Sequence, residues 1–480
     1  MRFLPFLVYA LVAWFSLGYH HPDEHFQILE PAMVKLGRAP ASDLAWEFEA
    51  QIRPGLQPLM ATKLIQGAEA IGIRSPFNQA FLLRLIIGWA TLLLWQRYAE
   101  VFFSREAERR FFGLLLLLLW LAPYFNVRFS SENAAALAFW GGVLLLLKGT
   151  AAGQTNIWKV SAAGLVLALS FYLRFQMGFA LLGLGFWLLV VAKSKRRIWL
   201  CLVAGGMAGL ALGAGADYWL YGEWVLTPLN YFTVNILENK AVAWGAEPWW
   251  YYGSASLLEW APPLSLLLWA AALTAMYHMP KRVELWCFVP FFLAHSVVAH
   301  KELRFLLPML LPLLLFASSG WLSYLPALVK NKILRGSLRV LWVLALAVNF
   351  ILLPLRSILP AKDSVAYYRY IYKESLNQSA SCAGTDPIYL WVPQDFEFYK
   401  MVGLKANFYR SEHVITQAYD GEGPVQVSQC DYVLTLRPNQ PKWAGKPTLR
   451  REYCLLPEFL LKFNINNWQD RSNIWTIWKL

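Results

Sequence analysis

The sequence predicts an all-α polytopic membrane protein that carries a small α/β domain at its C-terminal end. Hydrophobic residues make up 58% of the 480 residues and charged residues only 15%, whereas soluble domains are about 45–50% apolar and about 25% charged. Apolar runs recur up to residue 356, and short strand-like patterns replace them afterwards. We therefore expect a transmembrane domain over 1–356 and an extracytoplasmic α/β domain over 357–480.

About eleven transmembrane helices are expected, because a spanning helix needs about 20 apolar residues. Arg84 and Glu284 fall inside apolar runs and blur two boundaries. The first run is interpreted as a retained helix, since no A-x-A-like cleavage site follows it and many further spans do. The expected spans lie near 3–18, 80–96, 111–126, 133–147, 160–173, 177–192, 199–216, 256–277, 283–299, 305–322 and 338–356.

The distribution of basic residues predicts the topology in the lipid bilayer. Alternate loops are rich in Lys and Arg, for example KSKRR at 193–197, and the positive-inside rule places these loops in the cytoplasm together with the N-terminus. The loop after the first span, the loop at 217–255 and the loop at 300–304 then share the outer side with the C-terminal domain. The same clustering explains the net charge of +13 without a nucleic-acid partner.

The C-terminal domain should contain short strands and one short helix. Strands are expected in DPIYLWVPQ (386–394), PVQVSQCDYVLTLR (424–437) and SNIWTIWKL (472–480), and a helix in DFEFYKMVGL (395–404). Two cysteines, Cys201 and Cys287, lie in spans and are expected in the core. Three others lie in the outer domain: Cys382, Cys430 and Cys454. Disulfides are allowed there, and one pair of these cysteines is expected to be able to form one.

Two carboxylates stand at the mouth of the first span, in HPDEHFQILEP (21–31). Charged groups at the bilayer edge are costly when they are drawn toward its interior, so their presence there requires a reason. Asp23 or Glu24 could act as a general base that removes a proton from an acceptor hydroxyl. The structural alternative is an interfacial acidic cluster that caps the next helix.

Two further stretches combine charged or polar residues with aromatic ones. In WEFEAQIRPGLQP (46–58), Glu47, Glu49 and Arg53 taken alone would be surface salt bridges. The region from DYWLYGEWVLTPLNYFTVN (217–235) to WGAEPWWYY (244–252) is dense in Trp and Tyr and includes Asn230 and Glu247. It fits an interfacial aromatic belt and fits equally well a groove for a lipid or a sugar face.

Positive groups gather on the outer side in HKELRF (300–305), against the positive-inside bias. His300, Lys301 and Arg304 would pair naturally with an anion such as a lipid phosphate. The alternative is that these side chains snorkel and pair internally with Glu302.

These motifs, in this order, resemble the GT-C membrane glycosyltransferases that add mannose to glycolipids. The most similar branch contains the mannosyltransferases of glycosylphosphatidylinositol anchors and of the asparagine-linked glycan precursor. The resemblance covers residues 20 to about 320, from HPDEHFQILEPA to HKELRFLLPMLLPLLL. The sequence departs from the family pattern at Pro54, where Ser is usual, and at Tyr231, where Phe is usual.

The resemblance implies an inverting transfer of a sugar, mannose, from a polyprenyl-phosphate donor to a glycolipid or glycan acceptor. It assigns catalysis to Asp23 as the general base and to Glu24, with Glu302 orienting the cations. No cofactor or metal is expected, because cationic side chains can neutralise the phosphate. The residues expected to bind the donor phosphate are His300, Lys301, Arg304 and Arg53, and those expected to bind substrate are His21, Gln27, Glu47, Asn230, Glu247 and Trp249.

The alternative function is a lipid-linked sugar flippase or transporter without transferase activity. Transporters place ionisable residues near the membrane midplane, on broken helices and in repeats, whereas these motifs lie at loop edges. The short lead before the first span favours a bacterial homologue in the cytoplasmic membrane; a eukaryotic one would lie in the endoplasmic reticulum.

Overall fold

The structure is a computed structural model that divides into two compact units. Unit 1 comprises residues 1–13, 46–63 and 82–357, and unit 2 comprises residues 14–45, 64–81 and 358–480. The predicted division at 356/357 into two contiguous domains stays a prediction. The residues that the structure describes are 3–151, 154–328, 331–378, 387–419, 431–436, 449–453, 461–471 and 474–479.

Unit 1 is helical. Four helices have residues in both units: α1 (Leu4–Phe15), α5 (Leu56–Ala70), α6 (Pro76–Phe102) and α19 (Lys332–Ile358). The other α-helices of unit 1 are α4 (Trp46–Glu49), α7 (Glu106–Leu118), α8 (Leu121–Asn126), α9 (Ser131–Gly149), α10 (Ile157–Leu173), α11 (Met177–Val190), α12 (Arg196–Tyr221), α13 (Thr227–Phe232), α14 (Tyr251–Glu259), α15 (Leu264–His278), α16 (Val283–Val297), α17 (Leu310–Ser319) and α18 (Leu325–Leu328). Shorter 3₁₀ or π turns are η3 (Thr233–Leu237), η4 (Lys240–Trp244), η5 (Leu303–Met309) and η6 (Gly320–Tyr324).

Each predicted span overlaps a helix, and the protein is a multi-pass integral membrane protein. The range 111–126 is split between α7 and α8, and 256–277 is split between α14 and α15. The predicted count of eleven stays a prediction. Among the described residues, four helical segments are long and apolar enough to cross a membrane: Pro76–Phe102, Arg196–Tyr221, Leu303–Tyr324 and Lys332–Leu376.

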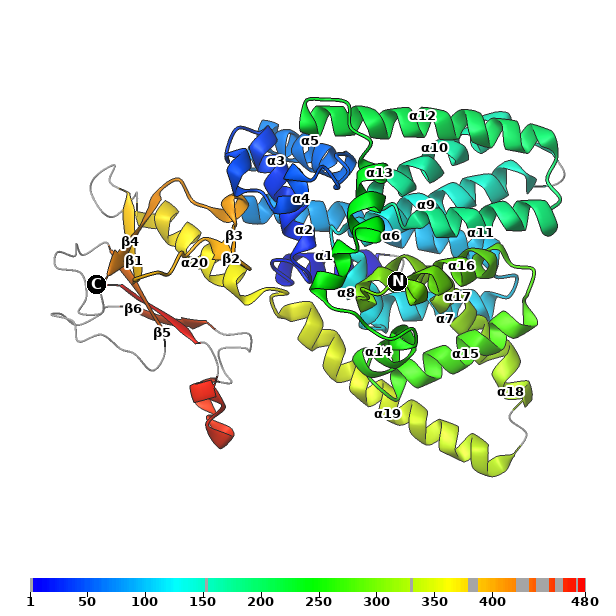
Figure 1. The fold of residues 1–480 in the computed structure, drawn as a ribbon. Coiled ribbons are helices and arrows are strands. Elements are labelled where there is room, and N and C mark those ends of the chain that lie inside the picture. The colour runs from blue at the N-terminus through cyan, green and yellow to red at the C-terminus, as the bar shows by residue number, and fades with distance from the viewer. Residues whose placement is uncertain are drawn as a thin grey trace. The chain divides into compact units, whose positions relative to one another are not determined.

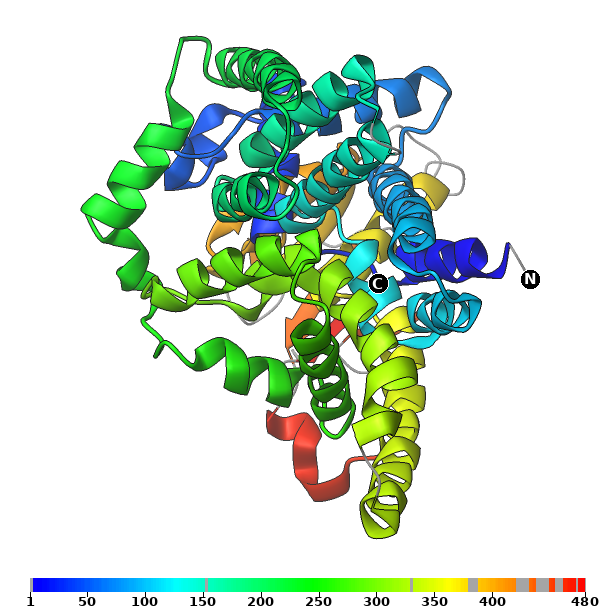
Figure 2. The ribbon, with the colours of Figure 1, turned by 90° about the vertical axis from the view of Figure 1, so that its right-hand side faces the viewer.

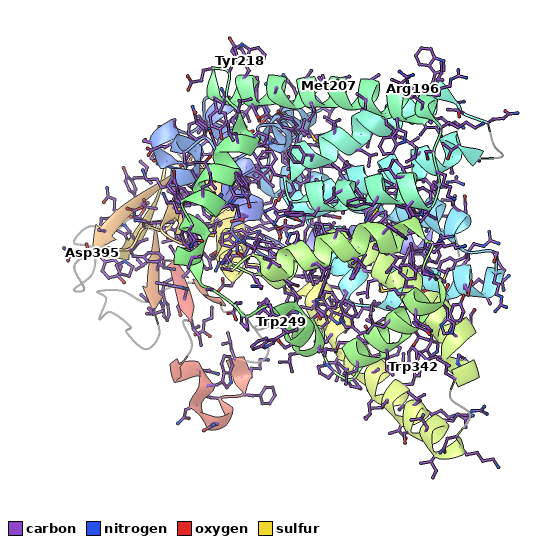
Figure 3. All side chains as sticks on the ribbon, turned by 45° about the vertical axis from the view of Figure 1, so that its right-hand side comes forward. Arg196, Met207, Tyr218, Trp249, Trp342 and Asp395 are labelled. Atoms are coloured by element: carbon purple, nitrogen blue, oxygen red, sulfur yellow. The ribbon has the colours of Figure 1, made fainter. Side chains whose placement is uncertain are left out.

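Small residues allow the helices of unit 1 to approach closely, as is common between membrane helices. Helices α10 and α12 run side by side (Figures 1 and 2). A Cβ added at Gly164 would lie 2.2 Å from the carbonyl oxygen of Leu202, and one added at Gly205 would lie 1.8 Å from that of Ser161. The opposite side of α12 is exposed, and Figure 3 shows Arg196, Met207 and Tyr218 pointing outward along it.

The two charged residues inside apolar runs are buried and paired. The Arg84 Nε donates to the carbonyl oxygen of Ala13 at 2.8 Å. The Glu284 carboxylate accepts from the Tyr98 hydroxyl at 2.9 Å and from Arg282 Nε at 3.1 Å. Each of the two buried side chains therefore has at least one hydrogen-bonding partner, as buried polar groups normally do.

Unit 2 confirms the predicted small α/β region near the C-terminus. Its five-stranded sheet has the order β4-β1-β5-β7-β6, with parallel pairs between β1 and its two neighbours and antiparallel pairs around β7 (Figure 1). The strands are β1 (Ile388–Pro393), β4 (Val414–Tyr419), β5 (Tyr432–Leu436), β6 (Leu449–Tyr453), β7 (Trp475–Lys479) and the short pair β2 (Lys400–Met401) and β3 (Leu404–Lys405). The helical elements are α2 (Asp23–Phe26), α3 (Leu29–Lys35), α20 (Asp363–Gln378), η1 (Ala41–Asp43), η7 (Asn407–Tyr409) and η9 (Ile465–Arg471).

The helix predicted over 395–404 is wrong, because this stretch forms the β2–β3 hairpin. Its two turn residues have positive φ, 52° at Val402 and 80° at Gly403, as the common two-residue hairpin turn requires. Strands β1, β5 and β7 fall within the three predicted strand segments. Of the two cysteines expected in the core, Cys287 is buried and Cys201 is only half-buried. The other three, with the predicted disulfide, lie outside the described residues.

Candidate functional site

The candidate site in unit 1 is built on the connection between α16 and η5, which carries the HKELR motif. The His300 Nε2 lies 3.0 Å from Glu302 Oε1, and its Nδ1 lies 3.0 Å from the carbonyl oxygen of Gly245. The Arg304 Nε donates to Glu302 Oε2 at 2.5 Å, and its Nη2 donates to Glu302 Oε1 at 3.1 Å. The internal pair with Glu302 considered from the sequence is therefore present, and Glu302 orients both His300 and Arg304.

Lys301 differs from its neighbours in its partners. Its ammonium group donates to the carbonyl oxygens of Glu247 at 2.7 Å and of Ala299 at 3.4 Å. The Glu247 N–H in turn donates to the Ala299 carbonyl at 2.9 Å. The 245–247 segment and the 299–301 segment are therefore hydrogen-bonded to each other beside the lysine. Lys301 is 5% exposed, and burial lowers the pKa of its ammonium group, while the charge of Glu247 opposes that shift. Among the described residues, no carboxylate oxygen forms an ion pair with this ammonium.

A buried ion-pair network lies behind Arg304. The carboxylate of Glu132 accepts from Arg304 Nη1 at 2.9 Å and lies 3.1 Å from Arg174 Nη1. Both guanidinium groups also lie over the ring of Phe305, at 5.0 and 4.9 Å from its centroid. Glu132 stands in the first turn of α9, whose N-terminus is capped by the Ser130 hydroxyl, and an acidic residue is favourable there.

The predicted pair Glu47 and Arg53 forms a second cluster in unit 1. The Arg53 Nη2 donates to Glu47 Oε1 at 2.5 Å, and the Arg53 carbonyl accepts from the Tyr221 hydroxyl at 2.7 Å. The Asn230 side chain donates to the carbonyl oxygen of Gln51 at 3.3 Å. The 46–55 segment, the end of α12 and α13 therefore meet at one place.

The Tyr231 side chain joins the two clusters. Its hydroxyl accepts from Gln176 Nε2 at 2.5 Å, and its ring lies 5.5 Å from the ring of Phe175 and 6.0 Å from the Arg53 guanidinium. Gln176 follows Arg174 in the connection between α10 and α11. Residues 174–176 thus link the two clusters through Tyr231: Arg174 pairs with Glu132, and Phe175 and Gln176 contact the tyrosine that lies beside Arg53.

The two predicted catalytic carboxylates lie in unit 2, on α2. The Asp23 Oδ1 lies 3.4 Å from His21 Nδ1, and Asp23 is partly exposed. Glu24 is buried and accepts from the backbone N–H of His20 at 3.3 Å. Gln27 ends the helix, and its backbone N–H donates to the Asp23 carbonyl at 3.3 Å.

One predicted substrate residue is prominently exposed. The Trp249 side chain is 71% exposed and packs edge-on against Trp250 at 5.7 Å, and Figure 3 shows it at the protein surface. The aromatic belt and the groove for a lipid or a sugar face both stay predictions. Within the described ranges, no group of three or more His, Cys, Asp or Glu residues could hold a metal ion. The expectation that the reaction needs no metal stays a prediction.

A family model describing the Alg9-like mannosyltransferase family matches residues 1–390. The chain belongs to this family. GPI mannosyltransferase 3 of Yarrowia lipolytica is 26% identical over 64% of this chain and 59% of its own length, and that of Drosophila melanogaster is 26% identical over 72% of this chain and 59% of its own length. The chain thus spans less than two thirds of the length of these relatives.

The fold of this family member is similar to that of a solved structure. The crystal structure of ArnT from Cupriavidus metallidurans, bound to undecaprenyl phosphate, superposes with a TM-score of 0.53 over 99% of this chain and 96% of ArnT, at 13% identity. This similarity confirms the predicted GT-C fold.

Sequence reasoning missed the two residues behind Arg304 in this member of the Alg9-like family. Glu132 and Arg174 are buried, with Glu132 1% and Arg174 6% exposed. Glu132 directly precedes the expected span 133–147, and Arg174 directly follows the expected span 160–173. The available signal for both was their place at the end of an apolar run, on the side of the membrane where a residue of opposite charge is also expected.

Proposed function

We propose that the protein is an inverting mannosyltransferase that transfers mannose from a polyprenyl-phosphate donor to a hydroxyl of a glycolipid or glycan. Family membership supports mannose transfer. The undecaprenyl phosphate in the ArnT structure supports a lipid-phosphate ligand for this fold. The basic loops support an active site on the outer side of the membrane, with the bacterial cytoplasmic membrane as the predicted location.

The observation that carries the proposal is the environment of Lys301. A buried charge is normally paired with an opposite charge, and this ammonium contacts only two carbonyl oxygens among the described residues. A lipid phosphate would supply the missing anion. The Arg304 guanidinium, held by Glu132 and Glu302, adds a second positive charge next to Lys301 in the sequence motif, and His300 and Arg53 are the further donor-binding residues we propose.

The reaction is a single displacement at the anomeric carbon. The Asp23 carboxylate takes the proton of the acceptor hydroxyl, the acceptor oxygen forms a bond to the anomeric carbon, and the bond from that carbon to the phosphate oxygen breaks. Polyprenyl phosphate leaves with the electron pair, and Lys301 and Arg304 stabilise its charge. Glu24 orients the acceptor, and His21, Gln27, Glu47, Asn230, Glu247 and Trp249 are proposed to bind substrate.

Purified protein incubated with labelled polyprenyl-phosphate mannose and native lipid extract should yield a labelled lipid or glycan product. The Asp23→Asn variant should fold and bind donor but lose nearly all turnover, and Glu24→Gln should lose less. The reversed order would assign the base to Glu24. Translocation of a lipid-linked sugar without transfer, in protein that binds donor, would overturn the enzyme assignment in favour of a flippase.

A further inference from the structure

The first outer loop folds with the C-terminal part of the chain in unit 2. The carbonyl oxygen of Leu17 accepts from the backbone N–H groups of Ala361 at 2.7 Å and of Lys362 at 3.1 Å. Gly18 has a φ of +81°, and a Cβ added there would lie 2.8 Å from Lys362 Cβ. The chain therefore approaches residues 361–362 closely before it enters α2, the helix that carries Asp23.

His25 anchors α2 to η7, a short turn of the C-terminal segment. The His25 Nε2 lies 2.7 Å from Glu30 Oε1, and both side chains are almost completely buried. The same Glu30 oxygen accepts from the backbone N–H of Phe408 at 3.1 Å. The imidazole ring stacks on Tyr409, with centroids 5.3 Å apart and an interplanar angle of 7°.

A second attachment holds the other side of this turn. The Asp43 carboxylate accepts from Asn407 Nδ2 at 3.1 Å and lies 3.1 Å from Lys405 Nζ. Asp43 belongs to η1, at the far end of the loop that begins with α2. The turn at 407–409 is thus contacted by residues before and after α3, and it serves as a fixed point for the whole loop.

The position of Asp23 depends on the contacts of His25 with Glu30 and Tyr409, because α2 is too short to hold its own conformation. The helix has four residues, far fewer than an independently stable helix needs. Successive residues of an α-helix are about 100° apart around its axis, so Asp23 and His25 project on largely opposite sides. Fixing His25 against Glu30 and Tyr409 therefore fixes the rotation of α2 and with it the direction of the Asp23 carboxylate.

We propose that the C-terminal segment positions the catalytic loop, and that His25 is the positioning residue that transmits this constraint. The inference rests on the proposed role of Asp23 as the general base. It gives the C-terminal domain a function in the chemistry of the transferase, through one imidazole on the helix that carries the base.

The test separates catalytic turnover from donor binding, with the full-length protein in detergent or nanodiscs. His25→Ala and Tyr409→Ala should each lower kcat by about 10- to 100-fold, since small misplacements of reacting groups cost rates of that order. The Kd for polyprenyl-phosphate mannose should stay within about twofold, because Lys301 and Arg304 are unchanged. The double variant should lose no more than the larger single loss, as contacting residues are not additive.

Tyr432→Phe provides the matched control. It removes a 2.6 Å hydrogen bond to Glu374 in the same unit without touching α2 or η7, and it should keep the wild-type kcat. Glu30→Gln, which keeps the shape of the side chain, should show the same selective loss of kcat to a smaller extent, and it decides the question if His25→Ala does not fold.

Three outcomes would overturn the inference: a wild-type kcat in both His25→Ala and Tyr409→Ala, an equal loss of kcat and donor affinity, or an equal loss in Tyr432→Phe. The Asp23→Asn variant, measured in the same assay, keeps the two proposals apart. An active Asp23→Asn variant refutes the role of Asp23 itself. An inactive Asp23→Asn variant beside fully active His25 and Tyr409 variants refutes only the positioning role.

Discussion

Lys301 is a buried ammonium group whose described partners are two carbonyl oxygens. Replacing it by Met keeps most of the side-chain length and removes the charge. We expect donor affinity to fall by about 1.5–3 kcal/mol, the range for a lost hydrogen bond to a charged group, which is about 10- to 150-fold in Kd. Equilibrium binding of a polyprenyl-phosphate donor to Lys301→Met measures this loss. Lys281→Met, at an exposed residue of another loop, should bind donor normally, and wild-type affinity in Lys301→Met would remove the phosphate role.

The pH dependence of donor binding follows from the same residue. Burial lowers the pKa of Lys301 below its ordinary value of 10.5, and Glu247 partly opposes this. Between the folded and unfolded pKa values the unfolded state binds more protons, so this residue's contribution to stability rises with pH there. Donor affinity should change in the opposite direction, because the amine loses the charge that attracts the phosphate.

A titration of donor Kd across the alkaline range tests this expectation. Affinity should begin to fall below pH 10.5 in the wild type. The fall should be smaller in Lys301→Arg, whose guanidinium stays charged. A wild-type profile that is flat up to the ordinary lysine pKa would contradict the assignment.

At the scale of elements, Asp217 ties α12 to two segments that carry predicted site residues. Its Oδ1 accepts from the Gly55 N–H at 2.7 Å, and its Oδ2 accepts from the Thr227 hydroxyl at 2.5 Å. Gly55 follows Arg53 by two residues, and Thr227 begins the helix that carries Asn230. The approach is close, since a Cβ added at Gly55 would lie 2.3 Å from the Ala216 carbonyl oxygen. Asp217 is completely buried.

Asp217→Ala should therefore release both segments at once. We expect it to destabilise the protein by about 1–3 kcal/mol, because two donors lose their buried acceptor, and to weaken substrate binding through Arg53 and Asn230. Thermal unfolding and the substrate KM measure the two effects. Glu284→Gln alters a buried carboxylate of α16 away from these segments, and should affect stability alone. An unchanged KM in Asp217→Ala would show that the carboxylate only supports the fold.

The elements also show what the sequence could and could not predict. Apolar runs located the helices because burial in lipid and burial in protein select the same residue types. They could not predict that Glu132 and Arg174 pair behind Arg304, since a pair 42 residues apart along the chain depends on how the ends of α9 and α10 meet. The short β2–β3 pair was also beyond prediction, since its turn needs the positive φ values at Val402 and Gly403, which depend on local pairing. The motifs identified charged residues, and tertiary contacts decided the partners of each.

At the scale of the whole molecule, the helices of unit 1 carry two separate clusters of charged residues at their ends. Glu132, Arg174 and Arg304 meet at one end of their helices. Another group gathers where α6 meets α7: the Arg105 Nη1 donates to the Ser323 hydroxyl at 3.1 Å, and that hydroxyl donates to Glu108 at 2.5 Å. Arg105 belongs to the loops that the positive-inside rule places in the cytoplasm, whereas Arg174 and Arg304 belong to the outer loops.

The predicted topology then requires the basic loop before α12 and the C-terminal sheet to face opposite sides of the membrane. In a cysteine-free background, a single cysteine at Lys195, just before α12, should react with an impermeant thiol reagent only in inverted vesicles. A cysteine at Glu412, an exposed residue beside β4, should react only in intact cells or right-side-out vesicles. Both positions must be labelled after solubilisation in detergent, which shows that the thiols are accessible. Labelling of both cysteines from one side would refute the odd number of spans and the common outer face of the HPDE and HKELR loops. The site for a lipid-phosphate donor would then need a different orientation in the membrane.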